Sequence, residues 1–204
     1  MKKYVLEAIG TMFLVLVYGL TNDPLAIGLV LATLIYGGMY VSGGHFNPAV
    51  SFAYYIRKDI NLKVLLGYTL SQILGSFAAS GVLLMITSSI FLAQPPTAST
   101  ISQHITGEIL MSFLLIFSYL SLLNNKGKGI KRIHALGVGL TFTAALLISN
   151  PMSGGYLNPA VSIGTSFIDF LAINNKSFSH IPLFTLAPLT GSILAVLLDW
   201  YIKD

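Results

Sequence analysis

A ten-residue stretch, SGGHFNPAVS at residues 42–51, recurs as SGGYLNPAVS at residues 153–162. Eight of the ten positions are identical, and the two copies lie 111 residues apart. Asn is a favoured helix N-cap and Pro is favoured at the first helical position, so each Asn-Pro-Ala predicts the start of a helix. The paired glycines before each Asn permit an irregular backbone there. The chain therefore contains two helix starts at equivalent points of two related halves.

The composition indicates that lipid surrounds most of this chain. Hydrophobic residues make up 54% and charged residues 9% of the 204 residues, whereas a soluble domain carries about 25% charged residues. Six apolar segments approach the roughly 20 residues that a membrane-spanning helix needs. They are residues 4–20, 25–41, 62–86, 103–123, 133–149 and 180–202. We expect an all-α membrane protein with six transmembrane helices and two re-entrant half-helices, forming a single domain over residues 1–204.

The two halves, at about residues 1–95 and 101–204, each contain three spans, so the second is inverted relative to the first. From Pro48 to Arg57 a helix rises about 14 Å, which is half a bilayer, and Pro159 starts a similar run. Inverted half-helices of this kind meet with their N-termini at the midplane. There, Asn47 and Asn158 can cap with the side-chain oxygen and turn their NH₂ groups into a lumen. The positive helix ends favour neutral solutes and repel cations.

The basic residues predict the orientation of the chain. With a cytoplasmic N-terminus, ten of the eleven Lys and Arg residues lie on the cytoplasmic side and only Lys176 on the other. The ten are Lys2, Lys3, Arg57, Lys58, Lys63, Lys126, Lys128, Lys131, Arg132 and Lys203. The positive-inside rule then places both termini in the cytoplasm. This arrangement explains the net charge of +4 without a nucleic-acid partner, and we expect an integral multi-pass protein of the plasma (cell inner) membrane.

Over essentially its whole length the sequence resembles the aquaporin, or major intrinsic protein, family. The resemblance rests on the two boxes Asn47-Pro48-Ala49 and Asn158-Pro159-Ala160, on Glu7 and Glu108 with a hydroxyl residue four places on, on Gln72 with Gly75, and on Pro188 with Gly191. It implies a passive channel for water and small neutral solutes, with one pore per protomer and a homotetramer in the lipid bilayer. No metal-ligand spacing, cofactor motif or enzymatic constellation stands out in the sequence.

Three polar residues near the boxes allow two interpretations each. Glu7 and Glu108 are ionisable groups inside spans, which makes them candidates for a proton relay. The resemblance implies instead that each carboxylate supports the loop before a half-helix. His45 precedes the first box and is either a sensor of pH near neutrality or a hydrogen-bonded loop residue.

The resemblance also implies a narrow filter lined by four positions, which are Ile27, Leu146, Gly155 and Val161 in this sequence. Most members have Arg at the last position, and strict water channels have His at the second; this chain has Val and Leu. Such an apolar ring is either wide, admitting glycerol, urea, ammonia or gases with little water flux, or so narrow that it dewets. Two rival functions are a poorly conducting structural membrane protein and a proton-coupled transporter.

Overall fold

The computed structural model describes the backbone of residues 1–123, 128–172 and 176–203, and the side chains of these residues except 122, 123 and 128–132. The described backbone is helical and contains no strand. Its elements are α1 (Lys2–Thr21), α2 (Pro24–Gly38), α3 (Pro48–Ile56), α4 (Leu62–Thr87), α5 (Ile101–Leu123), α6 (Lys128–Ser153), α7 (Pro159–Leu171), the 3₁₀ turn η1 (Phe178–His180) and α8 (Ile181–Tyr201).

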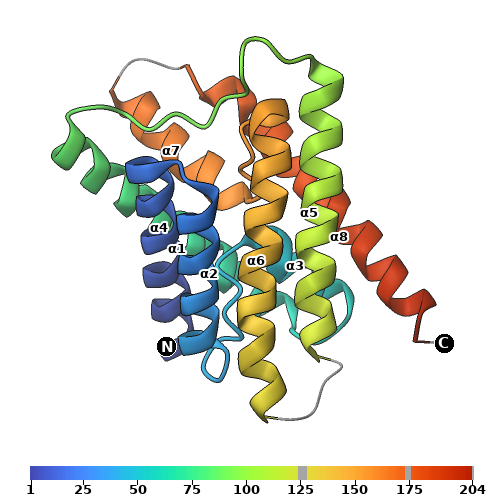
Figure 1. Ribbon diagram of the computed structural model, residues 1–204. Helices are drawn as coiled ribbons and strands as arrows, with labels where there is room; N and C mark the ends of the chain where they lie inside the picture. Colours follow the sequence, from blue (N-terminus) through green and yellow to red (C-terminus); the bar gives the residue numbers. More distant parts are fainter. Residues whose placement is uncertain (124–127, 173–175, 204) are drawn as a thin grey trace.

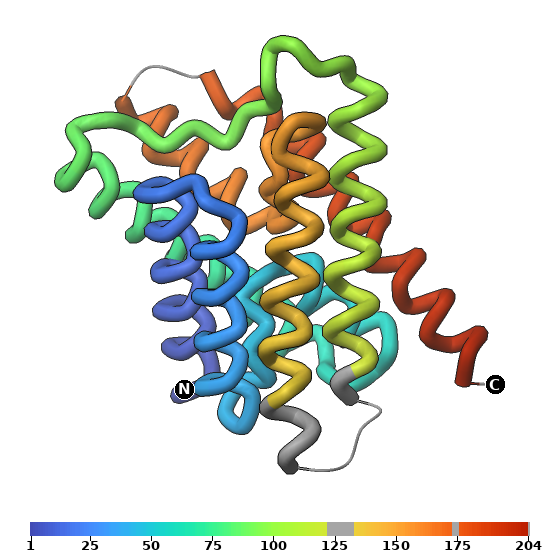
Figure 2. The backbone as a smooth tube through the Cα atoms, in the orientation of Figure 1, coloured from blue at the N-terminus to red at the C-terminus, as the bar shows by residue number. Residues whose placement is uncertain are grey.

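The long helices stand side by side, and the short helices α3 and α7 enter the bundle from opposite ends (Figures 1 and 2). Both termini lie at one end of the molecule, which we call the terminal end; the opposite end, where α1 finishes, is the far end. Inside the bundle α3 and α7 contact each other. The predicted helix starts at Pro48 and Pro159 are therefore observed, and they meet in the interior.

Within the described residues, five helical segments are long and apolar enough to cross a membrane, and they include α1, α4, α8 and much of α5 and α6. The second predicted span, residues 25–41, was too long, because α2 ends at Gly38 after 15 residues. The two glycines that close it favour a turn over further helix. The fifth prediction, residues 133–149, stopped too early, because α6 continues through Pro151 to Ser153. A proline this close to a helix end removes only one intrahelical hydrogen bond.

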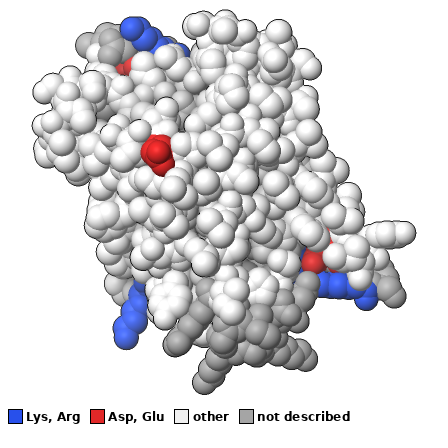
Figure 3. All heavy atoms as spheres, in the orientation of Figure 1, with Lys and Arg blue, Asp and Glu red and all other residues white. Residues whose placement is uncertain are grey.

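The exterior of the bundle is apolar. Along α4, Leu66 and Leu70 are 61% and 59% exposed, and Leu197 on α8 is 51% exposed. Figure 3 shows a face almost free of charged side chains, with the coloured residues confined to its upper left and its lower end. Such a surface fits lipid rather than water, and the chain is an integral multi-pass membrane protein.

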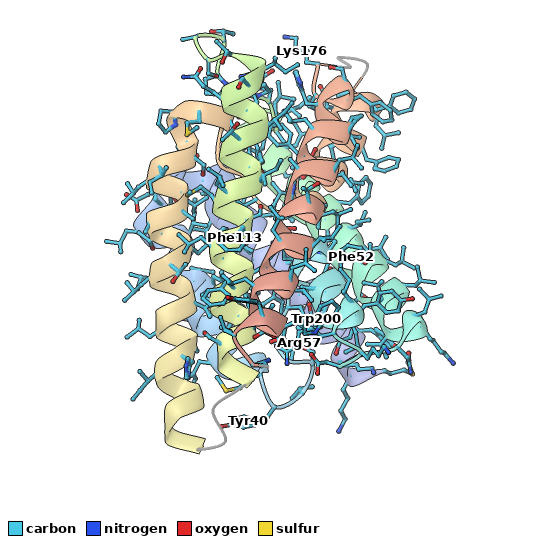
Figure 4. All side chains as sticks on the ribbon, turned by 90° about the vertical axis from the view of Figure 1, so that its right-hand side faces the viewer. Tyr40, Phe52, Arg57, Phe113, Lys176 and Trp200 are labelled. Carbon is cyan, nitrogen blue, oxygen red and sulfur yellow. The ribbon has the colours of Figure 1, made fainter. Side chains whose placement is uncertain are left out.

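Charged and interfacial residues mark the two ends. Figure 4 places Lys176 at the far end, and Arg57 and Trp200 toward the terminal end. Arg57 forms an ion pair of 2.9 Å with Asp199, which joins the end of α3 to the end of α8. Four of the ten basic residues behind the predicted orientation, at positions 126, 128, 131 and 132, lie outside the described side chains.

Two glycines allow the helices of each half to pack closely. At Gly75 on α4, an added methyl group would collide with the backbone carbonyl of Ala8 on α1. At Gly191 on α8, it would lie 2.6 Å from the carbonyl oxygen of Ile109 on α5. Small residues at such crossings let helix backbones approach in lipid, where packing drives association.

Candidate functional site

Each half-helix is capped by its own asparagine. The side-chain oxygen of Asn47 accepts a hydrogen bond of 2.8 Å from the backbone N–H of Ala49. That of Asn158 accepts one of 3.0 Å from Ala160. Both asparagines have extended backbone and are followed by Pro at the first helical position, the arrangement that the sequence predicts.

The two boxes are also joined to each other. The Asn47 side-chain NH₂ donates to the carbonyl of Leu157 at 2.8 Å, and that of Asn158 donates to the carbonyl of Phe46 at 3.0 Å. An amide NH₂ has two hydrogens, so each asparagine has one N–H hydrogen beyond the one donated to the other half. The expectation that these groups simply face a lumen is thereby refined, because half of their donor capacity ties the halves together.

The segments before the boxes have matching, unusual backbones. Positive φ angles occur at Gly43, Gly44 and Phe46, and again at Gly154, Gly155 and Leu157. Glycine adopts this region freely, whereas a residue with a Cβ atom loses roughly 1–2 kcal/mol there. Both segments therefore need support to hold their shape.

Glu7 gives this support in the first half. One carboxylate oxygen accepts from the Ser42 hydroxyl at 2.6 Å and from the N–H of His45 at 3.0 Å. The other accepts from the N–H of Phe46 at 2.6 Å and from the Gln72 side chain at 2.8 Å. The amide of the strained Phe46 is thus held by a charge-assisted bond.

Glu108 occupies the corresponding place in the second half. Its carboxylate accepts from the Ser153 hydroxyl at 2.7 Å, from the N–H of Tyr156 at 3.2 Å and from the N–H of Leu157 at 2.9 Å. Glu7 and Glu108 are both 0% exposed. A carboxylate with no access to water and with both oxygens engaged is placed to hold a loop rather than to exchange protons.

His45 is a buried loop residue. Its Nδ1 lies 3.1 Å from the Ser51 hydroxyl, and its ring packs against Tyr54 and Tyr68, with centroids 4.2 and 5.2 Å away. Only 1% of the residue is exposed. This enclosure favours the hydrogen-bonded interpretation over a sensor that meets solvent.

The structure brings three of the four filter candidates into one apolar cluster. Ile27 comes from α2, Leu146 from α6 and Val161 from the first turn of α7. All three are 0% exposed, so a water molecule has no access to them. This cluster is the main hydrophobic core of the protein, and the burial of all three candidates in it favours the narrow alternative over the wide one.

The fourth candidate, Gly155, offers a backbone carbonyl, but this group already has a partner. The hydroxyl of Tyr18 on α1 donates to the carbonyls of Gly155 and Tyr156, at 3.0 and 3.2 Å. In the other half, Tyr119 on α5 donates to Gly44 and His45, at 3.2 and 3.3 Å.

Neither tyrosine is among the residues predicted from the sequence, although a signal for both exists. Tyr18 follows Glu7 by eleven residues, and Tyr119 follows Glu108 by the same interval. A polar-tipped side chain repeated at one register of an inverted pair is the pattern that could have identified them.

A hollow of about 580 Å³ opens at the far end. Its lining includes Tyr18 and Asn22 from the first half, and Asn150, Gly154 and Tyr156 from the second. The hollow therefore lies between the halves and leads toward the Tyr18 hydroxyl.

Comparison with known proteins assigns this arrangement to a family. A family model described as Major intrinsic protein matches residues 1–199. Glycerol uptake facilitator protein-like 6 of Lactiplantibacillus plantarum is 32% identical over 210 residues, which cover 96% of this chain and 95% of that protein. The chain belongs to the major intrinsic protein family. This confirms the predicted membership and fold, and it makes the chain a transmembrane channel for water or small neutral solutes.

Further relatives agree with this assignment. A probable aquaporin NIP-type of Nicotiana alata is 29% identical over 209 residues, covering 95% of this chain and 74% of that protein. The solved aquaglyceroporin of Plasmodium falciparum superposes with a TM-score of 0.84 over 99% of this chain and 95% of its own, at 19% identity. At that identity the superposition supports the fold alone. The major intrinsic protein family consists of channels rather than enzymes.

Proposed function

We propose that this channel is a passive facilitator of small neutral solutes whose water permeability is low at rest. The observation that carries the proposal is the complete burial of Ile27, Leu146 and Val161 in one apolar cluster. A water molecule entering such a ring gives up hydrogen bonds without replacement, whereas a weakly hydrated solute gives up fewer. Ammonia is therefore the leading candidate, whereas glycerol and urea, which are larger than water and carry more hydrogen-bonding groups, need a wider ring; L. plantarum has a similar protein named for glycerol uptake.

Exclusion of cations follows from the midplane. The N-termini of α3 and α7 converge there, and each brings a partial positive charge and Asn donors. Glu7 and Glu108, the ionisable groups supporting the boxes, are buried with both oxygens hydrogen-bonded. This argues against a proton-coupled transporter, which needs a carboxylate that protons can reach.

Stopped-flow measurements on proteoliposomes test the proposal. We expect permeability to ammonia above that of empty vesicles, with a smaller rise in osmotic water permeability; glycerol is the larger solute for comparison. No rise for any solute would favour the structural rival and overturn the channel. High water permeability would overturn the dry ring while leaving the channel intact.

A substitution of equal size isolates the apolar ring. Val161→Thr adds one hydroxyl at the ring, and we expect water permeability to rise, because the hydroxyl offers water one hydrogen bond there. Val50→Thr is the matched control, because Val50 holds the same place in the first box and is also fully buried. Equal responses of the two variants would contradict the assignment of Val161 to the filter.

We also propose a homotetramer in the plasma membrane with the terminal end in the cytoplasm. The orientation is supported by Arg57 and Lys203 at the terminal end and by Lys176 at the far end. Protease access to a C-terminal tag in sealed vesicles tests the orientation, and light scattering of the detergent-solubilised protein tests the number of subunits.

A further inference from the structure

In the two segments before the boxes, the backbone N–H groups and the backbone carbonyls bond to different halves of the molecule. In the first segment the N–H groups of Gly44, His45 and Phe46 bond to Ser42 and Glu7, within their own half. The second segment does the same with Ser153 and Glu108.

The carbonyls of these residues bond in the opposite sense, to the other half. Those of Gly44 and His45 accept from Tyr119, and that of Phe46 accepts from Asn158. In the second segment, the three corresponding carbonyls accept from Tyr18 and Asn47. Each segment therefore turns three consecutive backbone carbonyls toward the junction between the halves, which makes six acceptors in all.

This junction is where a solute passes. Sites in inverted-repeat channels and transporters lie at the interface between the repeats, and backbone carbonyls are the groups that replace a lost hydration shell. The hollow at the far end is lined by both halves and reaches Tyr18. Tyr18 and Tyr119 therefore occupy the acceptors that a permeating molecule needs.

Both tyrosines are held firmly. Each is 1% exposed, and the Tyr18 ring packs against Phe91, Phe142 and Tyr156 with centroids 6.3 to 6.5 Å away. A buried aromatic side chain whose hydroxyl is hydrogen-bonded holds a fixed position, so each tyrosine obstructs the junction.

We propose that Tyr18 and Tyr119 are further permeation-limiting side chains of this channel, in series with the apolar ring and one on each side of the Asn47–Asn158 pair. A neutral solute that donates hydrogen bonds passes by displacing each hydroxyl from its two carbonyls. A solute without donors cannot make this exchange. The inference rests on the proposed channel function and names the groups that select its solutes.

The test uses Tyr18→Phe, Tyr119→Phe and the double variant in proteoliposomes, with water and ammonia as donor solutes and carbon dioxide as a solute without donors. Phenylalanine keeps the ring and removes the hydroxyl, which frees the carbonyls. Because these two sites and the apolar ring lie in series, three equal barriers allow at most about a 1.5-fold rise for each single variant and at most about a threefold rise for the double variant.

Tyr68→Phe is the matched control. Tyr68 is also buried and donates at 2.7 Å to a carbonyl of the same loop, that of Ser42. It does so from α4 in the same half, away from the junction, so we expect no rise in permeability. If a phenylalanine variant does not fold, the corresponding leucine variant takes its place.

The outcomes separate this inference from the function on which it rests. A larger rise in permeability for the double variant than for either single variant, seen only with donor solutes, supports the role of the two hydroxyls as barriers. Unchanged or lower permeability, with a lower melting temperature, assigns the hydroxyls a purely structural role and overturns the inference while the channel stands. Absence of permeability in wild type and in every folded variant overturns both.

Discussion

Glu7 accepts four hydrogen bonds beside the first box segment, residues 42–51, whereas Glu108 accepts three beside the second, residues 153–162. The additional donor is Gln72, which also bonds to the Ser51 hydroxyl at 3.1 Å. The first segment is therefore fastened by a side-chain network that lies within the bundle.

The second segment is fastened from outside. Pro188 stands where Gln72 stands in the first half and supplies no donor. Tyr156 replaces His45, and its hydroxyl bonds to the backbone of Leu92 and Gln94 in the loop at the far end. The inverted halves thus share the groups that hold each box, and they differ in whether the remaining support comes from a helix or from a loop.

The largest expected effect comes from removing the carboxylates. Glu7→Ala removes the acceptor of four hydrogen bonds and Glu108→Ala that of three, of which the Ser153 hydroxyl keeps a second acceptor in the Ser149 carbonyl at 3.3 Å. Each unsatisfied donor costs about 1–3 kcal/mol, so we expect both variants to lose at least about 2 kcal/mol of stability. The fraction of folded protein after detergent extraction and its melting temperature measure this. A greater loss for Glu108→Ala than for Glu7→Ala would contradict the comparison.

The next largest effect tests the close helix packing that the two halves share at Gly75 and Gly191. Gly75→Ala and Gly191→Ala each bring a methyl group against a backbone carbonyl of the neighbouring helix. We expect both to lower stability by about 1–3 kcal/mol through overpacking. Gly81→Ala is the control on α4, because nothing lies within 4 Å of its added methyl group. A loss in only one half would show that the two crossings are not equivalent.

The smallest expected effect tests the support that differs between the halves, which in the second half comes from the Tyr156 hydroxyl. Tyr156→Phe removes the hydroxyl that holds the loop at Leu92 and Gln94, and we expect a local loss of about 1 kcal/mol. Hydrogen exchange at Gln94 and its neighbours should accelerate, while the amides of residues 44–46 in the first segment stay unchanged. Equal acceleration of exchange at Gln94 and at residues 44–46 would contradict the view that the Tyr156 hydroxyl supports the second half alone.

Much of this architecture could be predicted from the sequence. The repeated Asn-Pro fixes two helix starts, because the cap and the proline act locally and need no tertiary information. Glu7 and Glu108 could also be identified from the sequence, because an ionisable group inside a membrane span is rare and needs a partner.

The remaining features depend on contacts between distant residues. Tyr18 and Tyr119 sit in apolar helices, where an aromatic residue reads as ordinary packing until its hydroxyl finds a carbonyl in the other half. The burial of Ile27, Leu146 and Val161 depends on how three separate helices pack in the core. The early end of α2 and the late end of α6 reflect how a chain continues around glycine and proline, which short-range pattern alone decides poorly.

The exchange of hydrogen bonds between the boxes also constrains how the protein is made. The Phe46 carbonyl receives its hydrogen bond from Asn158, a residue 112 positions later in the chain. During synthesis from the N-terminus, the first half enters the membrane before this donor exists. The centre of the channel therefore closes late in biogenesis, when the second half arrives, and a chain stopped at the middle leaves its first box incomplete.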